Sequence, residues 1–103
     1  MKQVNKMEKF AILATIKAKP GNEEEVVEFL KSALPLANSE AGTVRWYAVQ
    51  TGPSTFCIFD TFETTDGRRA HLEGPIAEAL MAHAPALLAE EPIISFGDIL
   101  AVK

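Results

Sequence analysis

Runs of apolar residues in alternating or continuous order predict four β-strands along the chain. The runs cover residues 8–18, 43–51, 55–63 and 93–102, and they are rich in β-branched and aromatic side chains. Residues 52–54, Gly-Pro-Ser, separate the second run from the third and predict a hairpin turn. Four strands of this length are enough for one small sheet.

Between the first two strands, the apolar residues recur at helical spacing. Val26, Phe29, Leu30 and Ala33 line one face of a helix that begins after Asn22. Asn22 followed by Glu25 resembles a capping box. Since proline disrupts a helix interior, we expect the helix to end or kink at Pro35, with residues 35–41 as an irregular turn.

Two more helices are expected between the third and fourth strands. Asp66 is a plausible N-cap for a short helix over residues 67–73, and a longer one covers about residues 75–90. Pro85 predicts a kink or an early stop in the second of these. The order β-α-β-β-α-β predicts an α+β, ferredoxin-like fold with a four-stranded antiparallel sheet and helices on one face.

The strand patterns place apolar side chains on both faces of this sheet. In residues 56–62, FCIFDTF, Cys57, Phe59 and Thr61 fall on one face and the other four residues on the opposite face. Helices can cover only one face, and an uncovered apolar face is uncommon in monomers. We therefore expect a homodimer that pairs sheet against sheet.

Composition and charge narrow the class of protein. The 103 residues suit a single domain over residues 7–103, with residues 1–6 as a flexible N-terminal tail. A net charge of −4 argues against nucleic-acid binding. Without an apolar run long enough for a membrane helix or a signal peptide, we expect a cytoplasmic protein that does not bind membranes.

Few residues suit metal or nucleotide chemistry. Two histidines twelve residues apart and the single Cys57 do not form a metal-ligand cluster. The chain has no glycine-rich phosphate loop.

Three segments of the sequence resemble the antibiotic biosynthesis monooxygenase (ABM) family of the dimeric α+β-barrel superfamily. They are EAGTVRWYAVQ, FCIFDTFETTDGRRAHLEGP and IISFGDILAV. The more specific marks are the E-x-G-T motif of Glu40, Gly42 and Thr43, and the series Phe62, Glu63 and His71. The resemblance implies two ferredoxin-like subunits paired as a barrel. It also implies oxidation of a small aromatic phenol, anthrone or quinol by O₂ without metal, flavin or other cofactor.

Two residues are candidate catalytic groups for such a reaction. His71 has an imidazole whose ordinary pKa, about 6.5, suits a base near neutral pH, although it could instead bridge to a carboxylate such as Glu63. Asp60 lies among apolar side chains, so it is either a pocket acid or base or a structural ion-pair partner of Arg45 or Arg68. The sequence leaves both alternatives open.

Three further residues are candidate substrate contacts. Trp46 could stack on a planar ring, Phe62 shares the face of Asp60, and His83 lies on an apolar helix stripe. Each is also compatible with ordinary core packing. Trp46 and its neighbour Tyr47 must point to opposite faces, so one is expected in the pocket and the other at the dimer interface.

The sequence is also compatible with other functions. A non-catalytic, dimeric small-molecule-binding or stress-associated protein would need only the pocket. Haem-degrading relatives of the superfamily use an asparagine in the first strand, which residues 13–15 lack, although His83 could ligate iron. Isomerase or decarboxylase chemistry on the same scaffold would need no O₂.

Overall fold

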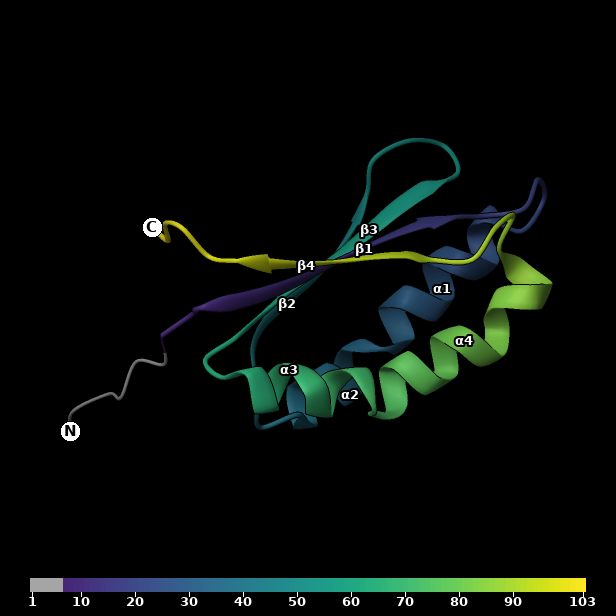
Figure 1. Cartoon of the computed structure of the whole chain (residues 1–103). Helices are drawn as coiled ribbons and strands as arrows, with labels where there is room; N and C mark the ends of the chain where they lie inside the picture. Colours follow the sequence, from purple (N-terminus) through teal and green to yellow (C-terminus); the bar gives the residue numbers. More distant parts are fainter. Residues whose placement is uncertain (1–6) are drawn as a thin grey trace.

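The computed structural model describes residues 7–103 and contains one four-stranded sheet with four helices. The elements follow the order β1 (Phe10–Lys17), α1 (Glu23–Ser32), α2 (Leu34–Ser39), β2 (Thr43–Gln50), β3 (Thr55–Phe62), α3 (Thr65–Leu72), α4 (Pro75–Leu87) and β4 (Ile93–Asp98). The single helix expected between the first two strands is thus a pair of helices, and the two helices expected between β3 and β4 are both present. The strands pair antiparallel in the order β2-β3-β1-β4, which confirms the ferredoxin-like α+β fold (Figure 1).

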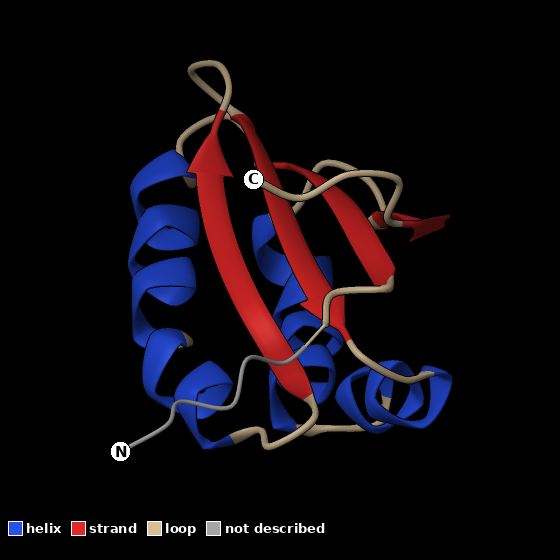
Figure 2. Ribbon diagram, turned by 90° about the vertical axis from the view of Figure 1, so that its left-hand side faces the viewer, coloured by secondary structure: helices blue, strands red, loops and turns tan. Residues whose placement is uncertain are grey.

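The helices gather on one side of the sheet and enclose the core there (Figure 2). The centre of this layer contains Ile16 and Phe56 from the sheet, Val26 and Leu30 from α1, and Leu80 from α4, all buried. The strand pattern dictates this arrangement because every second residue of β1 and β3 faces the helices.

The register of the sheet decides which residues surround Asp60. This residue on β3 lies opposite Ile12 on β1 and opposite Trp46 on β2, so all three side chains point to the helix side. Asp60 is 0% exposed. The sequence-based assignment of Asp60 to the face of Phe56 and Phe62 is therefore confirmed, and its carboxylate lies within the protein interior.

The segment after Pro35 differs from the prediction. It was expected to be an irregular turn, but α2 forms there, with Pro35 in its first turn. Proline is tolerated at that position because the amide that it lacks has no helical partner anyway. The proline thus separates α1 from α2 without ending the helical segment.

Both predicted helix caps differ in detail. Thr64, rather than Asp66, caps α3, and its hydroxyl accepts a hydrogen bond from the amide of Gly67 at 2.9 Å. At α1, the side chain of Asn22 caps no backbone amide but donates through Nδ2 to Glu25 at 2.6 Å. Thr64 takes the role because its extended backbone at the end of β3 lets its hydroxyl reach the helix.

The last two elements are shorter than predicted. α4 ends at Leu87, because Pro85 lies in its final turn and the chain becomes extended at Leu88. β4 ends at Asp98 rather than residue 102, since Asp98 lies opposite Phe10, the first residue of β1. Beyond that point, no strand in the described part of the chain lies beside it.

The second face of the sheet is open and largely apolar, as the pattern predicted. Leu13, Tyr47, Val49 and Ile93 point there and are 41–58% exposed. The edge strand β4 is exposed on both faces of the sheet, including Ile94 and Phe96 on the helix side. In the described residues, none of the helices has the length and apolar character that a bilayer crossing requires.

Candidate functional site

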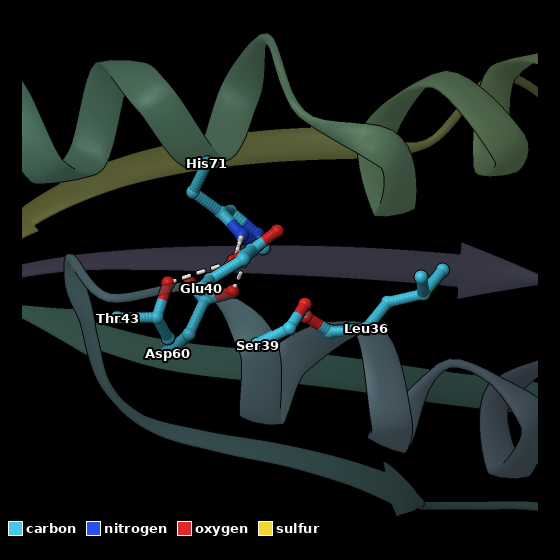
Figure 3. A network of polar contacts seen from close by, with 6 residues as sticks. All are labelled: Leu36, Ser39, Glu40, Thr43, Asp60 and His71. Atoms are coloured by element: carbon cyan, nitrogen blue, oxygen red, sulfur yellow. Dashed lines mark hydrogen bonds and ion pairs between the residues drawn. The ribbon is translucent and has the colours of Figure 1, made fainter.

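One histidine and two carboxyl side chains from different elements meet beneath α3 (Figure 3). His71, in the last turn of α3, lies between Glu40, at the end of α2, and Asp60 on β3. Its Nδ1 is 2.6 Å from Glu40 Oε1, and its Nε2 is 2.8 Å from Asp60 Oδ2. The imidazole thus has one carboxylate against each nitrogen.

Glu40 is itself held in position by its neighbours. The hydroxyl of Thr43 donates to the same Oε1 atom at 2.8 Å. A Cβ on Gly74 would lie 3.3 Å from Glu40 Oε2, so the turn between α3 and α4 closes over the carboxylate. Glu40 therefore joins α2, β2 and the α3–α4 turn at one point.

Two glycines allow α3 to approach the start of β2. A Cβ on Gly42 would lie 2.9 Å from Gly67 Cα, and a Cβ on Gly67 would lie 2.9 Å from the carbonyl oxygen of Gly42. Real side chains do not tolerate such contacts with backbone atoms. This close approach brings His71, one turn after Gly67, within reach of Glu40.

The charges around His71 favour its protonated form. Burial lowers the pKa of this imidazole, but the negative charges of Asp60 and then of Glu40, each within 2.8 Å of a ring nitrogen, raise it by more. The net effect is a pKa above the usual value of about 6.5. The raised pKa favours the imidazolium form of His71 over a wider pH range than in a free histidine.

Several buried polar atoms at this site lack hydrogen-bond partners among residues 7–103. They are Glu40 Oε2, Trp46 Nε1 and both carboxylate oxygens of Asp60. Asp60 Oδ2 is close to His71 Nε2, but this ion-pair contact lacks hydrogen-bond geometry. Unpaired buried polar groups are costly, and they are a common feature of functional sites.

The partner of Asp60 is His71, and neither arginine that the sequence suggested contacts it. Arg45 points to the open face and pairs with Glu8 at 3.4 Å. Arg68 donates to the carbonyl oxygens of Ala11 and Gly97. His71 likewise contacts Glu40 and Asp60 rather than Glu63, the bridging partner considered from the sequence.

An apolar cavity of about 390 Å³ lies between α1 and the edge of the sheet. Its lining includes Leu30 from α1, Leu34 from α2, Trp46 and Ala48 from β2, and Phe56 from β3. Trp46 is shared between this cavity and the site, because it lies directly across from Asp60. Neither Asp60 nor His71 lines the cavity.

The structure brings only some of the predicted site residues together. Phe62 is fully buried and packs against His71, with ring centroids 5.5 Å apart. His83 is exposed on α4 and packs on Phe29, with ring centroids 5.2 Å apart, in a contact between α1 and α4. Tyr47 lies on the open face, so Trp46 is the member of that pair that lines the cavity.

Glu40 is the site residue that the sequence analysis did not identify as functional. The available signal was the E-x-G-T motif, in which Glu40 binds His71, Gly42 permits the close approach of α3, and Thr43 holds the carboxylate. All three conspicuous positions of the motif thus serve one contact.

The site offers little to a metal or a haem iron. Both nitrogens of His71 face carboxylates, so neither is free to ligate. Over residues 7–103, no group of three or more His, Cys, Asp or Glu residues is arranged to hold a metal ion.

Comparisons with known proteins agree with the fold. The sequence model of a family described as antibiotic biosynthesis monooxygenase matches residues 9–83. A crystal structure of a protein of unknown function from Nitrosomonas europaea is 50% identical, with a TM-score of 0.93 over 96% of each chain. No curated protein matches the sequence.

More distant structures share the fold alone. A second protein from Nitrosomonas europaea, provisionally described as an antibiotic biosynthesis monooxygenase, is 17% identical with a TM-score of 0.80, covering 89% of this chain and 99% of that one. A protein from Shewanella oneidensis is 19% identical with a TM-score of 0.79, covering 94% of this chain and 95% of that one.

Proposed function

Because the chain belongs to the antibiotic biosynthesis monooxygenase family, we propose that it oxidises a small, electron-rich aromatic compound with O₂. The substrate class is a phenol, an anthrone or a quinol. One observation carries the proposal: a buried carboxylate–imidazole–carboxylate array adjoins Trp46, which also lines an apolar cavity. A cavity of about 390 Å³ is at the small end of the range usual for ligand sites.

In this proposal, the base is Asp60 rather than His71. Both nitrogens of His71 already face carboxylates, and its raised pKa favours the protonated form, which cannot accept a further proton. Asp60 Oδ1 is buried without a partner and is an acceptor. His71 and Glu40 are then positioning residues that hold the Asp60 carboxylate in place.

Trp46 has two roles in the proposed reaction. Its ring supplies a flat surface for the aromatic substrate, and its unpartnered Nε1–H is a donor for the developing oxyanion. Trp46 pairs with Asp60 across the sheet and also lines the cavity, so the indole links the cavity to the buried carboxylate.

The proposed reaction needs no reactant other than O₂. For an anthrone, Asp60 takes a proton from the substrate, and the resulting anion passes one electron to O₂. The two radicals combine to a peroxide anion, which takes the proton back from Asp60 and then loses water to leave a carbonyl group. A CH₂ group and O₂ thus become C=O and H₂O, with one oxygen atom in each product.

Oxygen uptake by the purified, metal-stripped protein tests the proposal. With a panel of anthrones, quinols and phenols, we expect consumption above the spontaneous rate for at least one class. Asp60→Asn should lower that rate about 100-fold or more, because general-base catalysis contributes on this scale. His83→Gln, at an exposed position away from the site, is the matched control and should retain full activity. Unchanged uptake in a folded Asp60→Asn variant would exclude Asp60 as the base.

A second candidate function is a dimeric small-molecule-binding protein without catalysis. The observation in its favour is that Asp60 and His71 are buried and absent from the cavity lining. The array would then be a structural link among α2, α3 and β3. A binder of this kind would gain thermal stability with aromatic ligands, yet it would consume no oxygen.

A further inference from the structure

The cavity is lined mainly by one stripe of a helical segment and by residues 46 and 48–50 of β2. Residues 27, 30, 31 and 34 recur at the spacing that places side chains on one side of a helix. Opposite them, Trp46, Ala48 and Gln50 alternate along the helix side of β2. The cavity is therefore an elongated space that follows β2.

The two ends of this space differ in chemistry. Leu34 and Trp46 also line a second, smaller hollow together, so the C-terminal part of the helical segment lies beside the start of β2. Trp46 marks that end, next to Asp60. Gln50 lies four residues further along β2, about 13 Å away at the usual rise of a strand.

Lys31 is the one charged residue in the cavity lining. It is exposed, and in the described part of the chain it forms no salt bridge, although the whole chain carries a net charge of −4. Its place in the last turn of α1 suits the helix dipole, which explains a lysine there but not its position beside an apolar cavity.

We propose that the cavity selects an aromatic ligand with an anionic substituent, and that Lys31 pairs with that anion. The ring lies toward Trp46, and the carboxylate or phenolate reaches Lys31, with the amide of Gln50 as a further donor. Whether the bound ligand is then oxidised rests on the proposed function. Its selective binding does not, because binding needs no turnover.

Calorimetric titration of the intact protein with 2-naphthoate and with its neutral analogue 2-naphthamide tests this inference. We expect naphthoate to bind about fivefold more tightly, the scale of a solvent-exposed ion pair, and the preference to weaken as salt is added. Lys31→Gln should abolish the preference while leaving the affinity for naphthamide within about twofold.

Two controls separate the specific role of Lys31 from general charge. Lys31→Arg keeps the cation and should keep the preference. Lys103→Gln makes the same change in net charge at the exposed C-terminus and should leave the preference for naphthoate unchanged. A lysine that only stabilises the end of α1 would lower the melting temperature of Lys31→Gln without altering the preference.

The outcomes distinguish this inference from the proposed function. Equal affinity for the two ligands, binding of neither, or a preference that survives in Lys31→Gln overturns the inference. Anion preference without oxygen uptake supports the inference and removes the oxygenase proposal. Oxygen uptake with neutral quinols alone, unaffected by Lys31→Gln, supports the oxygenase proposal and overturns the inference about Lys31.

Discussion

At the scale of single residues, the protonation of His71 organises the site. Two carboxyl groups, from Glu40 and Asp60, lie on either side of one imidazole and act on its charge together. Removing either carboxylate would weaken the effect that offsets burial and would therefore lower the pKa of His71. The three groups therefore act as one unit.

The raised pKa of His71 predicts that stability falls as pH rises. The folded protein retains a proton that the unfolded chain releases above its ordinary pKa of about 6.5. The stability that this proton contributes is fully present below about pH 6.5. It is lost as the pH rises through the pKa of His71 in the folded protein. Between the two values, the free energy of unfolding should decrease by about 1.4 kcal/mol per pH unit.

Urea denaturation across this pH range measures the slope. His71→Gln should remove the decrease, whereas the exposed His83→Gln should leave it in place. A wild-type stability that stays level or increases from pH 6.5 upward contradicts a protonated His71.

At the scale of elements, the position of α3 decides whether the site forms. Its N-terminus is capped by Thr64 and approaches the start of β2 through Gly42 and Gly67. Arg68 fixes the same helix to the far edge of the sheet, with its guanidinium 5.3 Å from the ring centre of Phe10 and 4.9 Å from that of Phe96. These contacts hold α3 from both sides.

Gly67→Ala should therefore destabilise the protein, although alanine favours helices by about 1 kcal/mol over glycine. The new methyl group would lie 2.9 Å from a backbone carbonyl oxygen, and such overpacking costs about 1–3 kcal/mol. We expect a lower urea midpoint and a weakened contact between His71 and Glu40. Gly97→Ala, where the Cβ meets no atom within 4 Å, is the matched control and should stay close to wild type.

At the scale of the whole molecule, the open face of the sheet predicts a homodimer. Leu13, Tyr47 and Val49 are each more than 40% exposed on that face. A second copy is the partner that the strand pattern suggests. Light scattering should give twice the chain mass of 11.2 kDa.

A charge on the open face should disrupt this dimer. Leu13→Glu places a carboxylate in the proposed interface and should give monomers or aggregates. Met81→Glu, on the helix side and 53% exposed, should remain dimeric. A wild-type protein that stays monomeric at high concentration excludes sheet-to-sheet pairing.

Local patterns in the sequence determined the order of the elements and the face of each strand. Side chains on a strand alternate between two faces. This alternation places Asp60 on the same face as Phe56 and Phe62, and it places Trp46 and Tyr47 on different faces of the sheet. Pro35 and Pro85 were harder to interpret, since the effect of a proline depends on its position within a helical turn.

The tertiary structure alone decided the partners of the charged groups. Glu40 and His71 are 31 residues apart, and the sequence suggested Glu63 for His71 and an arginine for Asp60. Their meeting depends on how closely α3 packs on β2, which two glycines without side chains set. No local pattern encodes that distance, because it arises from packing between segments that are remote along the chain.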